Sequence, residues 1–341
     1  MKSTRKAFGE FLVEKAAKDE NIVVVDADLS TATCTTDFAR LFPNRHFDVG
    51  IAEQDLVGFS AGLALSGKTV FATTFAMFLA GRAYEQIRNT VAYSNININL
   101  CATHTGLAVG EDGASHQCIE DIALMNTIPN MKIFCPADDI STKQILNECL
   151  KISGPKYIRL GRNSLRDVYS METNFKLGCS NIFGNGTDGT IFAIGSTLNI
   201  ALDAKSELKK HGIDVRVVDL YSIKPVDKDT IIESAMQTDK LVSIEDHNII
   251  SGIGSIISNI LTEYYPKKLY KLGVNDRFGK SGSIDKLYKM YNITKEDIMK
   301  IFLNNKWVLK STHFFYLLET NYILLYNYYV KLYLKENKWN H

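Results

Sequence analysis

The chain has 341 residues, of which 45 % are hydrophobic and 23 % charged, a balance typical of a globular protein with a large core. Its formal net charge of +1 gives no electrostatic reason to expect binding to nucleic acid or to an anionic membrane. It opens on MKSTRKAFGE, without a signal peptide, and no run of about 18 apolar residues precedes its last part, so we expect a cytoplasmic protein without a membrane span.

The first half of the chain alternates short β-branched apolar runs with helical patterns. Strands are predicted at Ile22–Val25, Thr69–Ala72, Ile96–Ala102, Lys132–Cys135 and Tyr157–Leu160. Helices are predicted at Lys6–Lys18, Gln54–Leu65, Gly81–Ala92 and Ser141–Lys151. Strands spaced by helices indicate βαβ units and a mainly parallel sheet. Residues 1–172 are therefore predicted as one doubly wound α/β domain.

A glycine-rich stretch separates this pattern from a second one. Asn174–Gly189 has four glycines and no periodicity, so residues 173–188 are predicted as a linker. Strands are then predicted at Thr190–Gly195, Asp214–Leu220, Lys240–Glu245 and Leu269–Val274, and helices at Thr197–His211, Lys228–Met236, Ser251–Tyr264 and Lys295–Leu303. Residues 189–305 thus form a second α/β domain. Residues 306–341 lack a clean pattern, and two hypotheses for this tail stay open: a readthrough product, or a helix that packs on a partner.

The six cysteines contain no CxxC pair, and several lie in apolar runs such as NLCAT and KIFCPAD. We expect buried free thiols in a reducing compartment.

Glu53 is the first candidate for chemistry. It lies in GIAEQ, between the strand-like HFDVG and an apolar helix start. Ligands of open α/β sheets bind where strands end and helices begin, and a carboxylate at a helix N-terminus is also favoured by the helix dipole. Spacing alone therefore leaves two interpretations, a helix-capping acid and a functional acid.

A second candidate is the segment THTGLAVGEDGASHQ. It places His104, Glu111, Asp112 and His116 within thirteen residues, with three glycines in the same segment. Glycines let the backbone approach a ligand, and histidines on a loop after a strand can shuttle protons or bind hydroxyls and phosphates. The alternative is a solvated surface loop.

Aromatic and basic residues complete the candidates. Phe75 and Phe78 are three residues apart, which fits either core packing or an aromatic face for a planar heterocycle. Arg5 lies in STRK and Arg162 in RLGR. Arginine suits bidentate phosphate contacts, although each of these taken alone is also typical of a solvated surface charge.

The first half resembles the pyrimidine-binding domain of the transketolase family, through six motifs in the same order: STRKA, VVVDADLS, GIAEQ, TTFAMF, ATHTGLAVGEDGASHQ and GPKYIRLGR. The second half resembles the family's C-terminal domain in GTIFAIGSTLNIALDAKSELKKHGIDVRVVDL. The resemblance covers roughly residues 3–304 and implies two doubly wound, mainly parallel-sheet α/β domains. It is specific because the motifs keep both order and spacing.

The resemblance implies a role for each candidate near thiamine diphosphate. Glu53 matches the glutamate that hydrogen-bonds the aminopyrimidine N1′ and activates the cofactor. Phe75 and Phe78 match aromatic residues that pack on the pyrimidine, and Asp28 matches an aspartate near the cofactor.

The same resemblance implies a substrate site. His116 and Asp112 match residues that contact the donor sugar's hydroxyls, and Arg5, His104 and Arg162 match the cluster that holds the sugar phosphate. Glu53, His104 and His116 are the expected catalytic residues. One departure is Ala32, which stands where family members often have a serine near the phosphate, so phosphate affinity or substrate preference is expected to differ.

A second departure concerns what the chain lacks. Full-length transketolases have an earlier domain with a GDG-led motif that binds the diphosphate through Mg²⁺, and this sequence has no match to it. The resemblance therefore implies that a separate N-terminal-half subunit supplies the diphosphate and Mg²⁺ site, in a heterotetramer, while this chain itself binds no metal. The expected reaction is transfer of a two-carbon ketol unit from a ketose phosphate to an aldose phosphate.

Three alternatives remain at this stage. Deoxyxylulose-phosphate synthase shares GIAEQ but typically has an Asp-Arg pair where Thr103 and His104 stand. The β subunits of 2-oxoacid dehydrogenases share the two-domain layout but lack GEDGxxHQ. A non-catalytic regulatory subunit is the third, and retention of the candidate residues argues against it.

Overall fold

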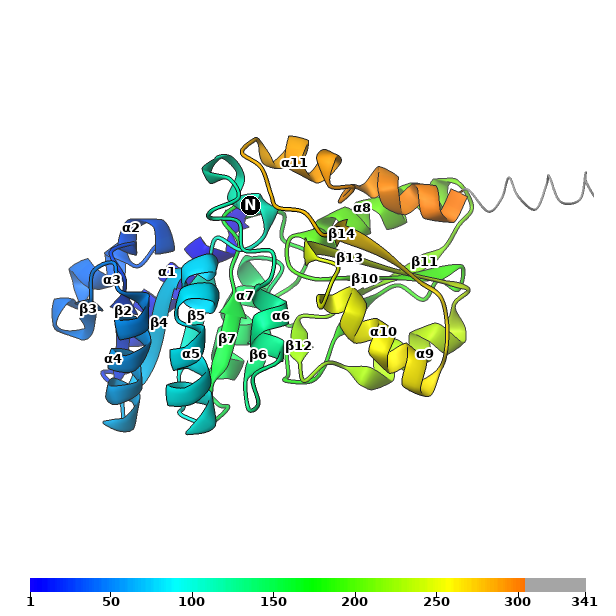
Figure 1. Cartoon of the computed structure of the whole chain (residues 1–341). Helices are drawn as coiled ribbons and strands as arrows, with labels where there is room; N and C mark the ends of the chain where they lie inside the picture. Colours follow the sequence, from blue (N-terminus) through cyan, green and yellow to red (C-terminus); the bar gives the residue numbers. More distant parts are fainter. Residues whose placement is uncertain (304–341) are drawn as a thin grey trace, which may run out of the picture. The chain divides into compact units, whose positions relative to one another are not determined.

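The computed structural model describes residues 1–303 of the chain, and the predicted tail at 306–341 lies outside them. Two α/β sheets organise these residues (Figure 1). The predicted class, two mainly parallel-sheet α/β domains, is confirmed.

The first sheet has seven strands in the order β12-β6-β7-β5-β4-β2-β3. Six are parallel, because helical crossovers join buried β-branched runs such as IVVVD. The strands are β2 (Ile22–Asp26), β3 (His46–Asp48), β4 (Thr69–Phe75), β5 (Asn99–Thr103), β6 (Lys132–Phe134) and β7 (Lys156–Arg159). The seventh, β12 (Ser222–Lys224), comes from the second half of the chain and pairs antiparallel with β6.

Helices cover both faces of this sheet, with α4, α5 and α6 on one side and α1 and α7 on the other (Figure 1). The helices are α1 (Thr4–Ala16), α2 (Ser30–Thr33), α3 (Thr36–Leu41), α4 (Glu53–Leu65), α5 (Tyr84–Gln86), α6 (Asp121–Asn126) and α7 (Asp139–Cys149), with a short 3₁₀ helix, η1 (Pro43–Arg45). A two-stranded ribbon pairs β1 (Lys2–Ser3) with β8 (Ser164–Leu165). Buried Val23, Val25, Leu56, Ala72 and Ile98 belong to the core between sheet and helices.

The segment after β4 differs from its prediction. A regular helix was expected at Gly81–Ala92, but two π-helical segments, η2 (Met77–Arg82) and η3 (Ile87–Tyr93), flank the single turn α5. Phe75 therefore ends a strand and Phe78 lies in η2, so the two are not on one helical turn. π-helical turns are rare and concentrate at functional sites.

The second sheet has the order β14-β13-β10-β11-β9. It contains β9 (Asn181–Phe183), β10 (Gly189–Ala193), β11 (Val215–Asp219), β13 (Lys240–Asn248) and β14 (Leu269–Val274). Its helices are α8 (Thr197–Lys210), α9 (Lys228–Gln237), α10 (Ile253–Tyr264) and α11 (Ile284–Met290), and residues 295–303 are also helical. Strand β9 lies inside the predicted linker and pairs antiparallel with the edge of β11.

Four of the six cysteines are buried as expected, namely Cys101, Cys118, Cys135 and Cys149, whereas Cys34 is partly exposed and Cys179 exposed. Burial raises the pKa of the Cys135 and Cys149 thiols to about 12, which keeps them protonated and unreactive. No helix among residues 1–303 combines the length and apolarity needed to cross a bilayer.

Candidate active site

The predicted site residues follow strands of the first sheet. Phe75 ends β4, His104 directly follows β5, and Arg162 comes three residues after β7. Because parallel strands end at the same edge of a sheet, these side chains converge at its carboxyl edge.

Four predicted residues form one ring cluster. The rings of Phe75 and Phe78 stack with their centroids 5.8 Å apart, and His104 stacks on Phe75 at 3.8 Å. His116 stands edge-on to both phenylalanines, at 6.1 Å from Phe75 and 5.4 Å from Phe78. A stacked aromatic pair with an imidazole edge beside it offers a face for a planar heterocycle.

Glu53 is the first residue of α4 and only 2 % exposed. Its carboxylate does not cap the helix, since Oε2 instead accepts a hydrogen bond from Arg82 at 2.8 Å. The guanidinium of Arg82 also lies over the ring of Phe78, 4.7 Å from its centroid. Arg82 thus joins the acid to the aromatic cluster.

Sequence reasoning missed Arg82. The signal available was its position four residues after Phe78, a separation that brings side chains together on one side of a helix. The side chain is half exposed, so a ligand can displace it from Glu53 and Phe78.

Arg5 and His104 form a linked pair. Nη1 of Arg5 lies 3.2 Å from Nε2 of His104, and Nδ1 of His104 lies 3.0 Å from Oγ1 of Thr103, whose hydroxyl donates to the carbonyl of Thr74. An arginine can only donate, so Nε2 accepts and Nδ1 carries the proton. Burial, together with the charges of Arg5 and Arg162, lowers the pKa of His104 to about 3.

Neutral His104 gives a testable pH dependence. Since folding lowers its pKa from 6.5 to about 3, the unfolded chain binds the proton more tightly, and stability falls as the pH drops below about 6.5. Between pH 7 and pH 5 we expect this residue to account for roughly 2 kcal/mol of lost unfolding free energy. Urea unfolding of wild type and His104→Gln at both pH values measures the difference. Equal losses in the two proteins would contradict a neutral imidazole.

A buried aspartate that the sequence analysis did not single out supports Arg5. Asp26 accepts hydrogen bonds from Thr33 at 2.9 Å and from Thr35 at 2.6 Å, which fixes the turn around α2. That turn presents the carbonyl of Ala32 to Nη1 of Arg5 at 2.6 Å. At position 32, where the family often has serine, the backbone carbonyl of Ala32 accepts the hydrogen bond from Arg5.

The segment 105–119, here called the histidine loop, carries Asp112 and His116. Asp112 pairs with Arg162 at 3.3 Å, and Arg162 also donates to the carbonyl of Val109 at 2.6 Å. Asp28 differs from the other candidates. It is exposed in a left-handed turn with φ of 57°, its N–H donates to Asp48, and no hydrogen bond within residues 1–303 joins it to another predicted site residue.

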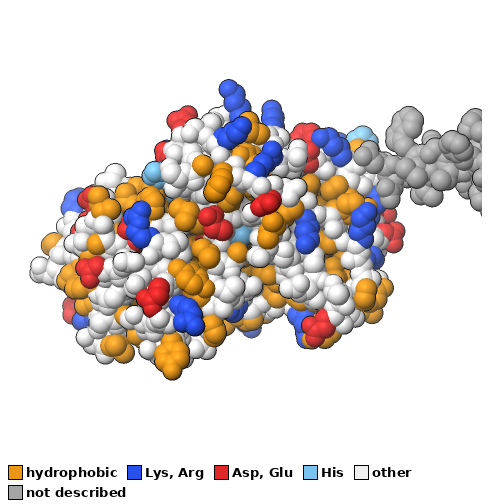
Figure 2. Space-filling view, in the orientation of Figure 1, with side chains coloured by type: hydrophobic (Ala, Val, Ile, Leu, Met, Phe, Trp, Pro, Cys, Tyr) orange, Lys and Arg blue, Asp and Glu red, His pale blue; other side chains and the backbone are white. Residues whose placement is uncertain are grey.

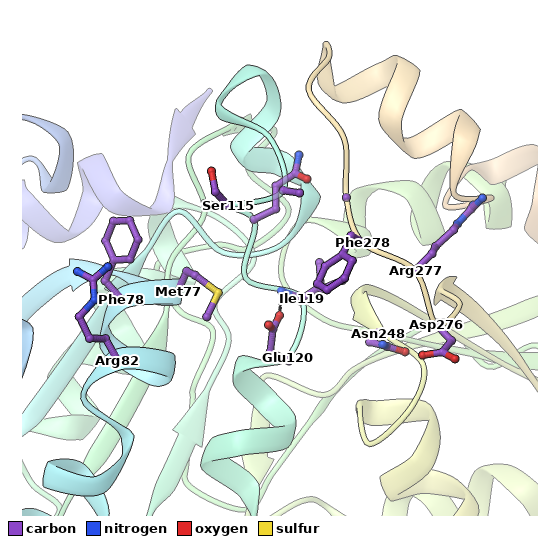
Figure 3. Close-up of a pocket in the computed structure, with 13 residues that line it drawn as sticks. Met77, Phe78, Arg82, Ser115, Ile119, Glu120, Asn248, Asp276, Arg277 and Phe278 are labelled. Atoms are coloured by element: carbon purple, nitrogen blue, oxygen red, sulfur yellow. Dashed lines mark hydrogen bonds between the residues drawn. The ribbon is translucent and has the colours of Figure 1, made fainter.

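Two cavities flank the histidine loop, and both have walls from the second domain. The larger, of about 560 Å³, lies between Phe78, Arg82 and Ser115 on one side and Asn248, Arg277 and Phe278 on the other (Figure 3). The smaller, of about 300 Å³, is lined by Arg5, Arg162 and Ser283 among others. Sequence reasoning missed this second-domain contribution, because no local pattern links residues so far apart in the chain.

Comparison with known proteins assigns the family. Residues 1–168 match the transketolase pyrimidine-binding domain, and residues 179–298 match the transketolase C-terminal domain. A protein of Methanocaldococcus jannaschii described as a transketolase C-terminal section is 45 % identical over 302 residues, covering 88 % of this chain and 95 % of that protein. The chain belongs to the transketolase family.

Two further transketolases are similar to it. One of the subunits of the apulose-4-phosphate transketolase of Phocaeicola vulgatus is 37 % identical over 301 residues, covering 88 % of this chain and 96 % of that polypeptide. The solved structure of a split-gene transketolase, an inactive β4 tetramer, superposes with a TM-score of 0.83 at 45 % identity, over 89 % of this chain and 98 % of that one. Family membership confirms the expected class, a transketolase-type, thiamine-diphosphate-dependent transferase.

Proposed function

We propose that this chain is the pyrimidine-binding half of a split transketolase, which moves a two-carbon ketol unit from a ketose phosphate to an aldose phosphate. One observation carries the proposal. A buried carboxylate at a helix N-terminus, Glu53, is joined through Arg82 to the stacked rings of Phe75 and Phe78, and Phe78 lines a cavity of about 560 Å³.

The residues present fit thiamine diphosphate. When bound, this cofactor supplies the electron sink that lets the bond beside a ketone carbonyl break. Phe75 and Phe78 would provide an apolar face for its aminopyrimidine ring, in place of their present contact with Arg82. Glu53 would hold a proton at a ring nitrogen, an interaction strengthened by its burial. We assign the catalytic roles to Glu53, His104 and His116.

The basic pair around the smaller cavity supports a phosphorylated substrate. Arg5 and Arg162 line it together and can donate several hydrogen bonds to one phosphate. The neutral imidazole of His104 lies 3.2 Å from the guanidinium of Arg5 and can take part in the same site. We assign Asp112 and His116, both on the histidine loop, to the hydroxyls of the sugar. We place Asp28 near the cofactor on family resemblance only.

A partner subunit is part of the proposal. We assign the diphosphate and Mg²⁺ to an N-terminal-half subunit, in a heterotetramer, because the family resemblance of this chain covers only the pyrimidine-binding and C-terminal domains. The relatives support this, since one is called a C-terminal section, another is named as one subunit of a transketolase, and a third is an inactive tetramer of β chains.

The outer face of α4 supports the same conclusion. Phe59 and Leu65 are exposed there, and open space surrounds Gly58 and Gly62. Glycine disfavours helix formation, so two on an exposed helix suggest that another backbone packs closely against this face. Apolar side chains also emerge on the surface of the first domain in Figure 2. We assign the partner subunit to this face.

The test is ketol transfer measured with and without a co-expressed partner that carries the GDG motif. We expect the purified chain, given thiamine diphosphate and Mg²⁺, to show negligible turnover, and the complex to be active. Phe59→Glu should block assembly by burying a charge, whereas Glu207→Gln, at a partly exposed position of α8, should not. Substantial turnover by the chain alone would refute the split-enzyme proposal.

A further inference from the structure

The histidine loop is held by a side chain from the second domain. Asp246 lies on β13 and is 2 % exposed. Its Oδ1 accepts a hydrogen bond from the N–H of Leu107 at 2.7 Å, and its Oδ2 accepts one from the N–H of Ala108 at 3.3 Å. One carboxylate thus binds two successive amides in the first turn of η4 (Leu107–Asp112), the segment that leads to Asp112.

The histidine loop approaches β13 so closely that position 106 must be a glycine. Gly106 has φ of 68°, and a Cβ added there would lie 2.3 Å from Oδ2 of Asp246. The other arm of the loop also meets β13, since the N–H of Asn248 donates to the carbonyl of Ile119 at 2.7 Å. Both arms of the histidine loop are therefore fixed to the carboxyl end of one strand.

Asp246 is itself held in place. The hydroxyl of Tyr288 donates to its Oδ2 at 3.0 Å, and Tyr288 also lies 3.0 Å from the hydroxyl of Ser196. The buried guanidinium of Arg159 donates to the backbone carbonyl of Asp246 at 2.7 Å. A carboxylate that accepts several hydrogen bonds in a buried setting has one orientation, so it can fix the geometry of what it binds.

We propose that Asp246 is a positioning residue of the candidate active site: it sets the place of Asp112 and His116 relative to the rings of Phe75, Phe78 and His104. The proposal rests on the function proposed above and gives the second domain a direct part in it. The reacting groups stay on the first domain, and the second domain determines how they are arranged.

A neighbouring residue provides the matched control. Glu245 is also buried on β13, and its carboxyl group also accepts two backbone hydrogen bonds, from Ile253 at 2.7 Å and Gly254 at 3.0 Å. These amides begin α10, away from the histidine loop. Glu245→Gln therefore perturbs the same kind of bond on the same strand without releasing the loop.

The first measurement is amide hydrogen exchange in the full chain, which needs neither partner nor cofactor. In Asp246→Asn we expect the backbone amides of Leu107 and Ala108 to exchange about ten-fold faster or more. The asparagine side chain has only one acceptor oxygen, so it cannot accept a hydrogen bond from both N–H groups in the same geometry. In Glu245→Gln the increase should appear at Ile253 and Gly254 instead. Wild-type exchange of the loop amides in Asp246→Asn would overturn the proposal.

The second measurement is steady-state ketol transfer by the complex. Asp246→Asn should lower kcat by about ten- to hundred-fold and raise KM for the donor, because the displaced loop takes His116 from the reacting atoms and Asp112 from the donor's hydroxyls. Glu245→Gln should keep kcat within about two-fold of wild type. Equal losses of kcat in the two variants would make Asp246 merely structural and overturn the proposal.

Two safeguards keep the outcomes separate. If Asp246→Asn folds poorly, Tyr288→Phe replaces it, because this variant removes the hydrogen bond from Tyr288 to the carboxylate of Asp246. It should speed amide exchange in the loop and lower kcat, each by a smaller factor than Asp246→Asn. No change in either quantity would contradict the proposal. If the wild-type complex transfers no ketol unit, the proposed function fails, while the exchange result still decides whether Asp246 holds the loop.

Discussion

Glu53→Gln is expected to lower the turnover of the assembled enzyme by about 10³-fold, the range associated with loss of a positioned acid–base group. The side chain keeps its size and can still accept a hydrogen bond from Arg82, so the fold should persist. What it loses is the negative charge that we propose holds a proton at a ring nitrogen of the cofactor. Initial rates of the complex with saturating thiamine diphosphate and Mg²⁺ measure the effect.

Asp55→Asn is the matched control for Glu53→Gln. Asp55 lies in the same first turn of α4 but is exposed, so the replacement removes the same charge from the same helix end. Because Asp55 shares the face of α4 that we assign to the partner, turnover is normalised to the amount of assembled complex, and we expect it to stay within about two-fold of wild type. Full activity of Glu53→Gln, without added base, would show that the assignment of Glu53 is wrong.

Asp121→Ala is expected to have the largest effect on stability, a loss of about 3–5 kcal/mol of unfolding free energy. Asp121 is fully buried and accepts hydrogen bonds from Nε of Arg159 at 2.9 Å and from the hydroxyl of Tyr157 at 3.1 Å. Removing the carboxylate leaves a buried guanidinium without its counter-charge. Urea unfolding of the purified chain measures the loss.

An exposed ion pair of the same length serves as control. Arg166 and Asp203 also lie 2.9 Å apart, but about half of each side chain is exposed. Asp203→Ala should cost less than about 1 kcal/mol. The double variant Asp121→Leu with Arg159→Met should be less destabilised than Asp121→Ala, because it leaves no guanidinium buried without a counter-charge, while the carbonyl of Asp246 loses its hydrogen bond from Arg159. A cost for Asp121→Ala as small as that for Asp203→Ala would contradict a stabilising buried pair.

Much of the fold was predictable because its signals are local. Buried parallel strands such as IVVVD at β2 are continuous apolar runs, and α8 begins and ends within one residue of its prediction. The short elements were not predictable. Strand β12 has three residues and exists because β6 offers an edge, and the π-helical turns after β4 follow no apolar period.

The residues of the candidate site were also only partly predictable from the sequence. The resemblance assigned Phe75 and Phe78 to the pyrimidine ring. It assigned His104 to the phosphate cluster and His116 to the donor sugar, and the structure packs these four rings in one cluster. The sequence could not distinguish Arg159 from Arg162, which are three residues apart in one basic motif. The first is buried in an ion pair and the second faces the smaller cavity.

Asp246 was not predictable for a related reason. It lies 139 residues from Leu107, and a carboxylate bound to backbone amides leaves no pattern in side-chain identity. Such contacts emerge only from the three-dimensional arrangement of the strands.

Strand β12 has a consequence for where this polypeptide can be divided. Because it completes the first sheet from beyond the 173–188 segment, residues 1–172 expressed alone would leave β6 as an open edge, which promotes aggregation. A cut between the two domains would expose unpaired backbone on one fragment and strand β12 on the other. Natural fission of genes for such proteins should therefore avoid that position.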